Sequence, residues 1–140
     1  MPTAQPPLPK WILIVSGLFA LLEMLVSLSL CFAPESVLET VDFSARGVHY
    51  VVYMWAARQF ALGVIFGFAT FKRSAPMLTI AYIFFLVMFA GDLLIGILQE
   101  DNGLIISAVV MCIISAALIY TINKRRQDLN LKATASAKAE

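Results

Sequence analysis

The sequence contains little charge. Asp, Glu, Lys and Arg together make up 14% of its 140 residues, while hydrophobic residues make up 61%. Soluble globular domains usually carry about 25% charged residues and about 45–50% apolar ones. A typical soluble domain and a disordered chain are therefore both excluded. The formal net charge is only +1, so we expect no nucleic-acid partner.

Residue types that build catalytic and metal sites are also scarce. The chain has one histidine, His49, and two cysteines, Cys31 and Cys112, which lack the C-x-x-C spacing of redox motifs. The sequence shows no metal-ligand spacing, no nucleotide-binding motif and no nucleophile with a nearby base. We therefore predict no catalytic residue and no metal site, and the sequence specifies no cofactor. An enzymatic role is not favoured.

Long hydrophobic runs dominate what is present. Four apolar blocks cover residues 11–32, 48–71, 77–98 and 104–122. Each is long enough to cross a hydrocarbon layer of about 30 Å as a helix. None shows the alternation of apolar and polar residues that is typical of a membrane strand. Backbone N–H and C=O groups in lipid must form hydrogen bonds within their own segment, so each block should be a helix. Short connectors force neighbouring spans to run antiparallel. The sequence predicts an all-α protein, a four-transmembrane-helix antiparallel bundle in a lipid bilayer.

The remaining segments are polar or rich in proline. Residues 1–10 predict an extended Pro-rich leader, and residues 123–140 predict a basic, flexible cytoplasmic tail. In the first connector, Ser36-Val37-Leu38-Glu39 fits a capping box, and Val37, Leu38 and Val41 share one helical face. This pattern predicts a short interfacial helix, with a plain loop as the alternative.

The distribution of basic residues predicts the orientation of the chain. With four spans, Arg46 lies on one side, and eight basic residues lie on the other: Lys10, Lys72, Arg73, Lys124, Arg125, Arg126, Lys132 and Lys138. Lys and Arg are enriched in cytoplasmic loops. We therefore predict a multi-pass protein with both termini in the cytoplasm.

Three ionisable residues interrupt the apolar blocks: Glu23, Arg58 and Asp92. Counted from the basic side, they lie at depths of roughly 18, 20 and 22 Å. A charge facing lipid costs several kcal/mol, so we expect all three to point inward and meet. Their formal sum is −1, which a proton, a cation or water would have to compensate. The cluster is either a functional site or an ionic clasp that fixes helix packing.

Several neighbours extend this candidate site. On the first span, Ser16, Ala20, Glu23 and Ser27 recur on one face. The predicted ligand-binding set is completed by polar and aromatic residues of the second span, namely Trp55, Gln59, Tyr53 and His49. Trp55 could stack on the Arg58 guanidinium. For the aromatic residues at the start of that span the alternatives are an interfacial belt and a polar lid over a cavity.

A stripe of small residues in the second span predicts a close helix contact. Gly63 and Gly67 form a GxxxG pattern, which allows two backbones to approach closely. The contact can lie within the bundle or between two copies in a homo-oligomer.

The stretch Trp55-Ala56-Ala57-Arg58-Gln59-Phe60-Ala61-Leu62-Gly63 and the pair Gly91-Asp92 resemble the DoxX-like families of small four-helix bacterial membrane proteins. The resemblance covers residues 11–122. It implies a bacterial inner membrane location and a lipophilic ligand such as a quinone, with a role as a subunit of a membrane redox complex.

Glu23 within Phe19-Ala20-Leu21-Leu22-Glu23 is also similar to the glutamate in the first helix of small multidrug-resistance transporters. Arg58, Asp92 and the strong charge bias depart from that family. Three hypotheses follow: a membrane protein that binds a lipophilic or small polar molecule, a proton-coupled transporter that uses Glu23, and a structural subunit.

Overall fold

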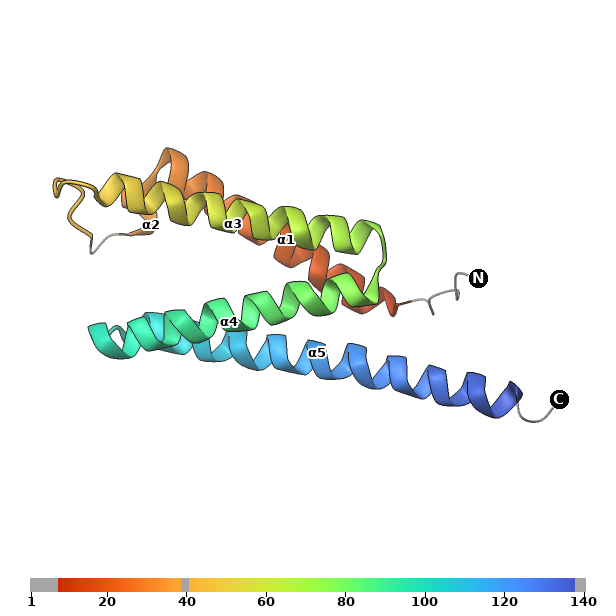
Figure 1. Cartoon of the computed structure of the whole chain (residues 1–140). Helices are drawn as coiled ribbons and strands as arrows, with labels where there is room; N and C mark the ends of the chain where they lie inside the picture. The colour runs from red at the N-terminus through yellow and green to blue at the C-terminus, as the bar shows by residue number, and fades with distance from the viewer. Residues whose placement is uncertain (1–7, 39–40, 138–140) are drawn as a thin grey trace. The chain divides into compact units, whose positions relative to one another are not determined.

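The computed structural model describes residues 8–38 and 41–137. It contains α1 (Lys10–Phe32), the short α2 (Pro34–Val37), α3 (Val48–Phe71), α4 (Ala75–Gln99) and α5 (Asn102–Ala137) (Figure 1). The predicted all-α architecture, with four long apolar helices and a short helix after the first, is confirmed. Most of the predicted leader, and Glu39 of the predicted capping box, lie outside the described residues.

All four long helices are long and apolar enough to cross a membrane. Many large apolar side chains are exposed on their surfaces, including Leu18 and Leu25 on α1 and Ile80 and Val87 on α4. In water such surfaces would aggregate, whereas lipid solvates them. The chain is therefore a small multi-pass integral membrane protein.

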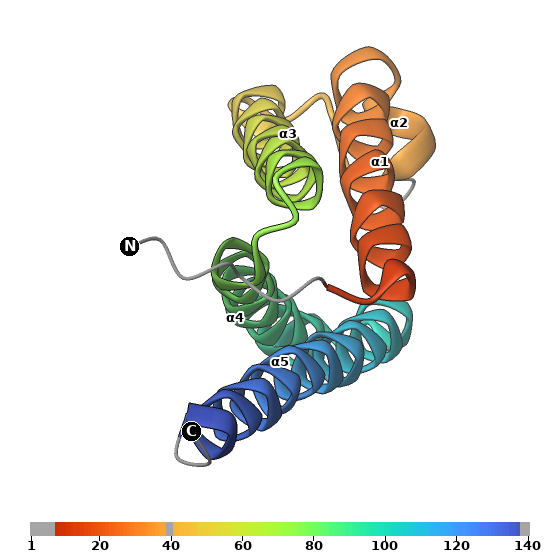
Figure 2. The same cartoon turned by 90° about the vertical axis from the view of Figure 1, so that its right-hand side faces the viewer.

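The chain divides into two compact units, residues 13–72 and residues 1–12 with 73–140. In the first unit α3 runs alongside α1, as Figures 1 and 2 both show. Leu30, Val52 and Ala56 form a buried apolar cluster between the two helices. A Cβ atom added at Gly63 would lie 3.0 Å from the Ala20 carbonyl oxygen. The GxxxG pattern therefore serves a contact between helices of the same unit.

In the second unit α4 packs against α5 across a tight turn (Figure 1). Pro76 lies in the first turn of α4, a position that proline favours because its fixed backbone angle suits the start of a helix. Glu100 ends α4 in a left-handed conformation, and the Leu104 amide donates to the Asp101 Oδ1 atom, 3.1 Å away. Asp101 thus caps the start of α5. A Cβ atom at Gly96 would lie 3.1 Å from the Ile105 amide nitrogen, so the helices approach closely beside this turn.

The position of α2 differs from the capping-box prediction. The helix begins at Pro34, with Ala33 at the N-cap and no side-chain cap. Ser36 lies inside the helix, and its hydroxyl donates to the Ala33 carbonyl oxygen at 2.7 Å. Proline is preorganised for the first helical position, which explains why the helix starts three residues earlier than an N-cap at Ser36 would place it.

The C-terminal segment also differs from the prediction. Instead of ending near Ile122, α5 continues as one helix to Ala137. Adding residues to an existing helix requires no new nucleation, and Lys, Arg, Gln, Leu and Ala all favour helix. The residues from 123 to 137 therefore extend α5 beyond the fourth apolar block, where a frayed tail was expected.

Candidate functional site

The buried face of α1 is unusually polar. Within the unit of residues 13–72 the buried positions of this helix are Ser16, Ala20, Glu23, Ser27 and Leu30. Their spacing of three and four residues places them on one stripe, as the sequence predicted for the first four. Glu23 is 1% exposed and Ser27 is 4% exposed. Three polar side chains of α1, Ser16, Glu23 and Ser27, therefore lie on its buried face, while many of its large apolar side chains are exposed.

The buried face of α3 carries one large polar side chain. Its buried positions are Val52, Ala56, Gln59, Leu62, Gly63, Phe66 and Ala69. Gln59 is 6% exposed, and its Oε1 atom has no hydrogen-bond partner within the described residues. A buried acceptor without a donor costs about 1–3 kcal/mol. Within the described residues, the Gln59 carbonyl oxygen therefore carries a desolvation cost that a hydrogen-bond donor would remove.

Two contacts bring these polar side chains to the same part of the helix pair. The Ser27 hydroxyl donates to the Ala56 carbonyl oxygen at 2.8 Å. About two turns away along both helices, Ala20 lies against Gly63. Glu23 and Gln59 both fall between these two contacts, and both are buried. We call Glu23, Ser27 and Gln59 the polar segment of the α1–α3 pair.

Arg58 does not join Glu23 in the expected ion pair. Its side chain is exposed, and no ion pair links it to Glu23 in the described part of the unit 13–72. The physical reason is angular, because successive helix residues are separated by about 100°. Burial of Gln59 turns the preceding residue away from the α1 contact. The depth of Arg58 along the helix axis predicted that it lies level with Glu23, but this depth does not specify which face of α3 carries Arg58.

Asp92 lies on α4, in the other unit, and is half-buried. The predicted approach of Asp92 to Arg58 stays a prediction.

The aromatic residues of the predicted site divide between two groups. The His49 ring lies edge-on to Phe43, with centroids 5.5 Å apart, and its centroid is 6.3 Å from that of Tyr53. Both His49 and Tyr53 are exposed. Trp55 is half-buried, packs against the apolar cluster of Leu30, Val52 and Ala56, and lines a pocket.

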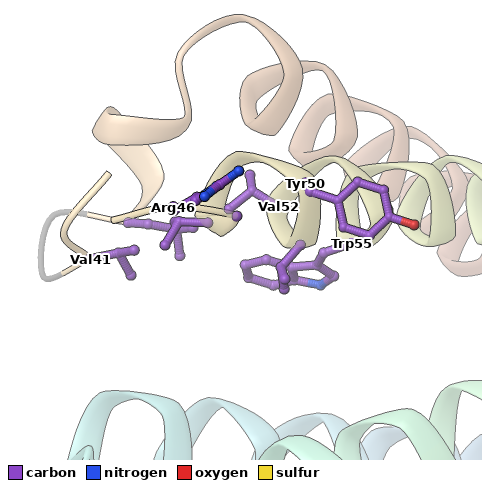
Figure 3. A pocket seen from close by; sticks show the side chains of 9 residues that line it. Val41, Arg46, Tyr50, Val52 and Trp55 are labelled. Atoms are coloured by element: carbon purple, nitrogen blue, oxygen red, sulfur yellow. The ribbon is translucent and has the colours of Figure 1, made fainter. Parts of the chain in front are cut away.

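This pocket lies at the beginning of α3 and has a volume of about 700 Å³. All of its lining residues belong to the unit 13–72: Leu38, Val41, Arg46, Gly47, Val48, Tyr50, Val51, Val52 and Trp55. Figure 3 shows Val41 and Arg46 at its connector end, with Tyr50 and Trp55 further along α3. We refer to it as the α3 pocket. Sequence reasoning did not assign Arg46 to a site, although it is the one basic residue on its predicted side.

The donor set for a metal ion is missing from the described residues, since no three His, Cys, Asp or Glu side chains there are grouped to hold one.

Comparisons of the chain with protein-family models, with curated proteins and with solved structures give no match. The resemblance to the DoxX-like families therefore remains a prediction from two short motifs.

Proposed function

We propose that this integral membrane protein binds a small lipophilic molecule that carries a hydroxyl donor, at the polar segment of the α1–α3 pair. The observation that carries the proposal is the buried Gln59 Oε1 atom, which lacks a donor within the described residues. Glu23 is buried in the same part of the helix pair. A ligand that donates hydrogen bonds would remove the desolvation cost of the Gln59 oxygen.

A hydroquinone fits this chemistry better than a quinone. Both have an apolar ring and partition into lipid, but only the hydroquinone has hydroxyl groups that donate. A quinone offers two acceptors and no donor, so it could meet the Gln59 amide only through the Nε2 donor and would leave the Oε1 atom without a hydrogen bond. The proposal thus narrows the quinone-like ligand that the DoxX resemblance implies to its reduced form. A role as a subunit of a membrane redox complex rests on that resemblance alone.

The test is a calorimetric titration of the full chain in an uncharged detergent. The probes are a hydroquinone with a decyl tail and its dimethyl ether, which has the same ring but no donor. We expect the hydroquinone to bind more tightly than the ether. Gln59→Leu should weaken hydroquinone binding about tenfold, equivalent to about 1.4 kcal/mol, and leave ether binding unchanged.

Gln99→Leu, the same substitution at an exposed position near the end of α4, is the matched control and should leave both affinities unchanged. Equal binding of hydroquinone and ether by the unmodified chain would overturn the proposal. An unchanged hydroquinone affinity in Gln59→Leu would also overturn it.

Burial of Glu23 on the α1 contact face also favours the structural alternative, in which the polar segment only fixes how α1 and α3 pack. Glu23→Gln in the same titration separates the two. If Glu23 belongs to a binding site, Glu23→Gln weakens hydroquinone binding and leaves the unfolding temperature unchanged. If the carboxyl is purely structural, the unfolding temperature changes, and the unmodified chain does not bind hydroquinone.

We further propose that the protein resides in a bacterial inner membrane with both termini in the cytoplasm. The support is the basic bias of the sequence, and the bacterial location comes from the DoxX resemblance.

A further inference from the structure

The α3 pocket combines an apolar wall with a single positive side chain. Apart from Arg46 its lining is aliphatic, aromatic or glycine. Arg46 is exposed, and no described residue forms an ion pair with it. Asp42, the acidic residue four positions earlier, instead accepts hydrogen bonds from Ser44. Among the described residues, nothing acidic therefore competes with an anion for this guanidinium.

A second positive feature lies at the same end of the pocket. Gly47, which also lines the pocket, is the N-cap of α3, and the N-terminus of a helix carries a partial positive charge. Trp55 lies eight residues beyond Gly47, roughly 12 Å along the helix. Between Gly47 and Trp55 the pocket wall is formed by three valines, Val48, Val51 and Val52. The pocket is thus positive at one end and apolar along its length.

We propose that the α3 pocket holds an anionic phospholipid. Its phosphate lies at Arg46 and the α3 N-terminus, and one acyl chain runs along Val51 toward Trp55. The combination is specific to an amphiphile, because the apolar wall contributes nothing to a free phosphate ion and the guanidinium contributes little to an uncharged lipid. The volume of about 700 Å³ is in the range of small-molecule sites. This lipid site is independent of the hydroquinone proposal, since it does not use the polar segment.

Trp55 provides a direct probe. The chain has two tryptophans, so Trp11→Phe leaves Trp55 as the only one. This variant is placed in lipid nanodiscs of phosphatidylcholine that contain a small fraction of lipid brominated in the middle of its acyl chains. Bromine quenches tryptophan fluorescence only on close approach. We expect brominated phosphatidylglycerol to quench Trp55 more strongly than an equal fraction of brominated phosphatidylcholine.

Arg46 is the residue that should set this preference. In the same background Arg46→Gln should lower the preference for phosphatidylglycerol about fivefold, which corresponds to one basic residue near a membrane surface. Arg46→Lys keeps the charge and should retain most of the preference. Lys10→Gln removes an exposed basic residue outside the pocket and should change nothing. Because Arg46 is exposed and precedes α3, its variants should keep the helical circular dichroism of the parent.

Three results would overturn the proposal. Equal quenching by the two brominated lipids would mean that ordinary surrounding lipid contacts Trp55. An unchanged preference in Arg46→Gln would remove the role of the guanidinium. Relief of quenching by soluble glycerol phosphate would assign the site to a phosphate group without the lipid.

Discussion

At the scale of single residues, the turn around Asp42 shows how a short polar sequence organises the connector before α3. The Asp42 Oδ1 atom accepts hydrogen bonds from the Ser44 amide at 2.9 Å and from the Ser44 hydroxyl at 2.6 Å. These two donors favour the ionised carboxylate and lower the pKa of Asp42 below its ordinary value of 3.8, the side-chain bond having the larger effect.

This turn should therefore depend on pH. A lowered pKa in the folded state means that the hydrogen bonds contribute stability above pH 3.8 and lose it as the pH falls through the lowered pKa. Ser44→Ala removes the hydroxyl donor and should raise the pKa of Asp42 part of the way back. Carbon-13 NMR of the labelled carboxyl measures this shift. Ser36→Ala, whose hydroxyl bonds elsewhere, is the control, and an equal effect of both variants would contradict the assignment.

Residue patterns predicted burial on α1 better than on α3. The positions Ser16, Ala20, Glu23 and Ser27 were found because polar and small residues repeat at helical spacing against a background of leucine. On α3 the small and aromatic residues are spread around the helix, so the polar pair Arg58 and Gln59 did not reveal which of them faces inward. Only the packing of Ala56 and Gly63 against α1 decided that Gln59 is buried.

At the scale of helices, the contact between α1 and α3 depends on Gly63. A Cβ atom there would lie 2.7 Å from the Met24 Cγ atom, 3.0 Å from the Ala20 carbonyl oxygen and 3.2 Å from the Met24 amide nitrogen. The Met24 side chain can move away, but the two backbone atoms can move only if the helices separate. Small residues allow this close approach.

We therefore expect Gly63→Ala to destabilise the protein by about 1–3 kcal/mol, the usual cost of overpacking. Thermal unfolding in detergent, followed by circular dichroism, measures the effect. Gly91→Ala is the matched control, because a Cβ atom at Gly91 meets nothing within 4 Å and alanine favours helix over glycine. If both variants unfold at the same temperature, the close approach at Gly63 contributes nothing to stability.

Helix positions were predictable, while helix ends were less so. Long apolar runs located the four spans because lipid excludes every other local structure for them. The helix ends depend on which nearby residues cap, start or continue a helix, and the apolar runs do not predict this. Pro34 started α2 ahead of Ser36, Asp101 capped α5 ahead of its apolar run, and the residues after Asn123 continued the helix.

At the scale of the whole molecule, an even number of spans places both termini on the same side of the membrane. The basic bias of the sequence supports our proposal that this side is the cytoplasm. A reporter that works only in the cytoplasm should therefore be active when fused after Glu140 and also when fused before Met1. Activity of a reporter that works only outside the cytoplasm, at either position, would contradict this orientation.

The uninterrupted length of α5 has a practical consequence. Its 36 residues amount to roughly 54 Å, whereas about 20 residues cross the hydrocarbon layer. The surplus of about 16 residues, roughly 24 Å, makes the end of this helix a stiff spacer rather than a tether. A rigid domain joined in helical phase to Ala137 would be held at a constant distance and rotation, which would provide an alignment marker for electron microscopy of so small a membrane protein.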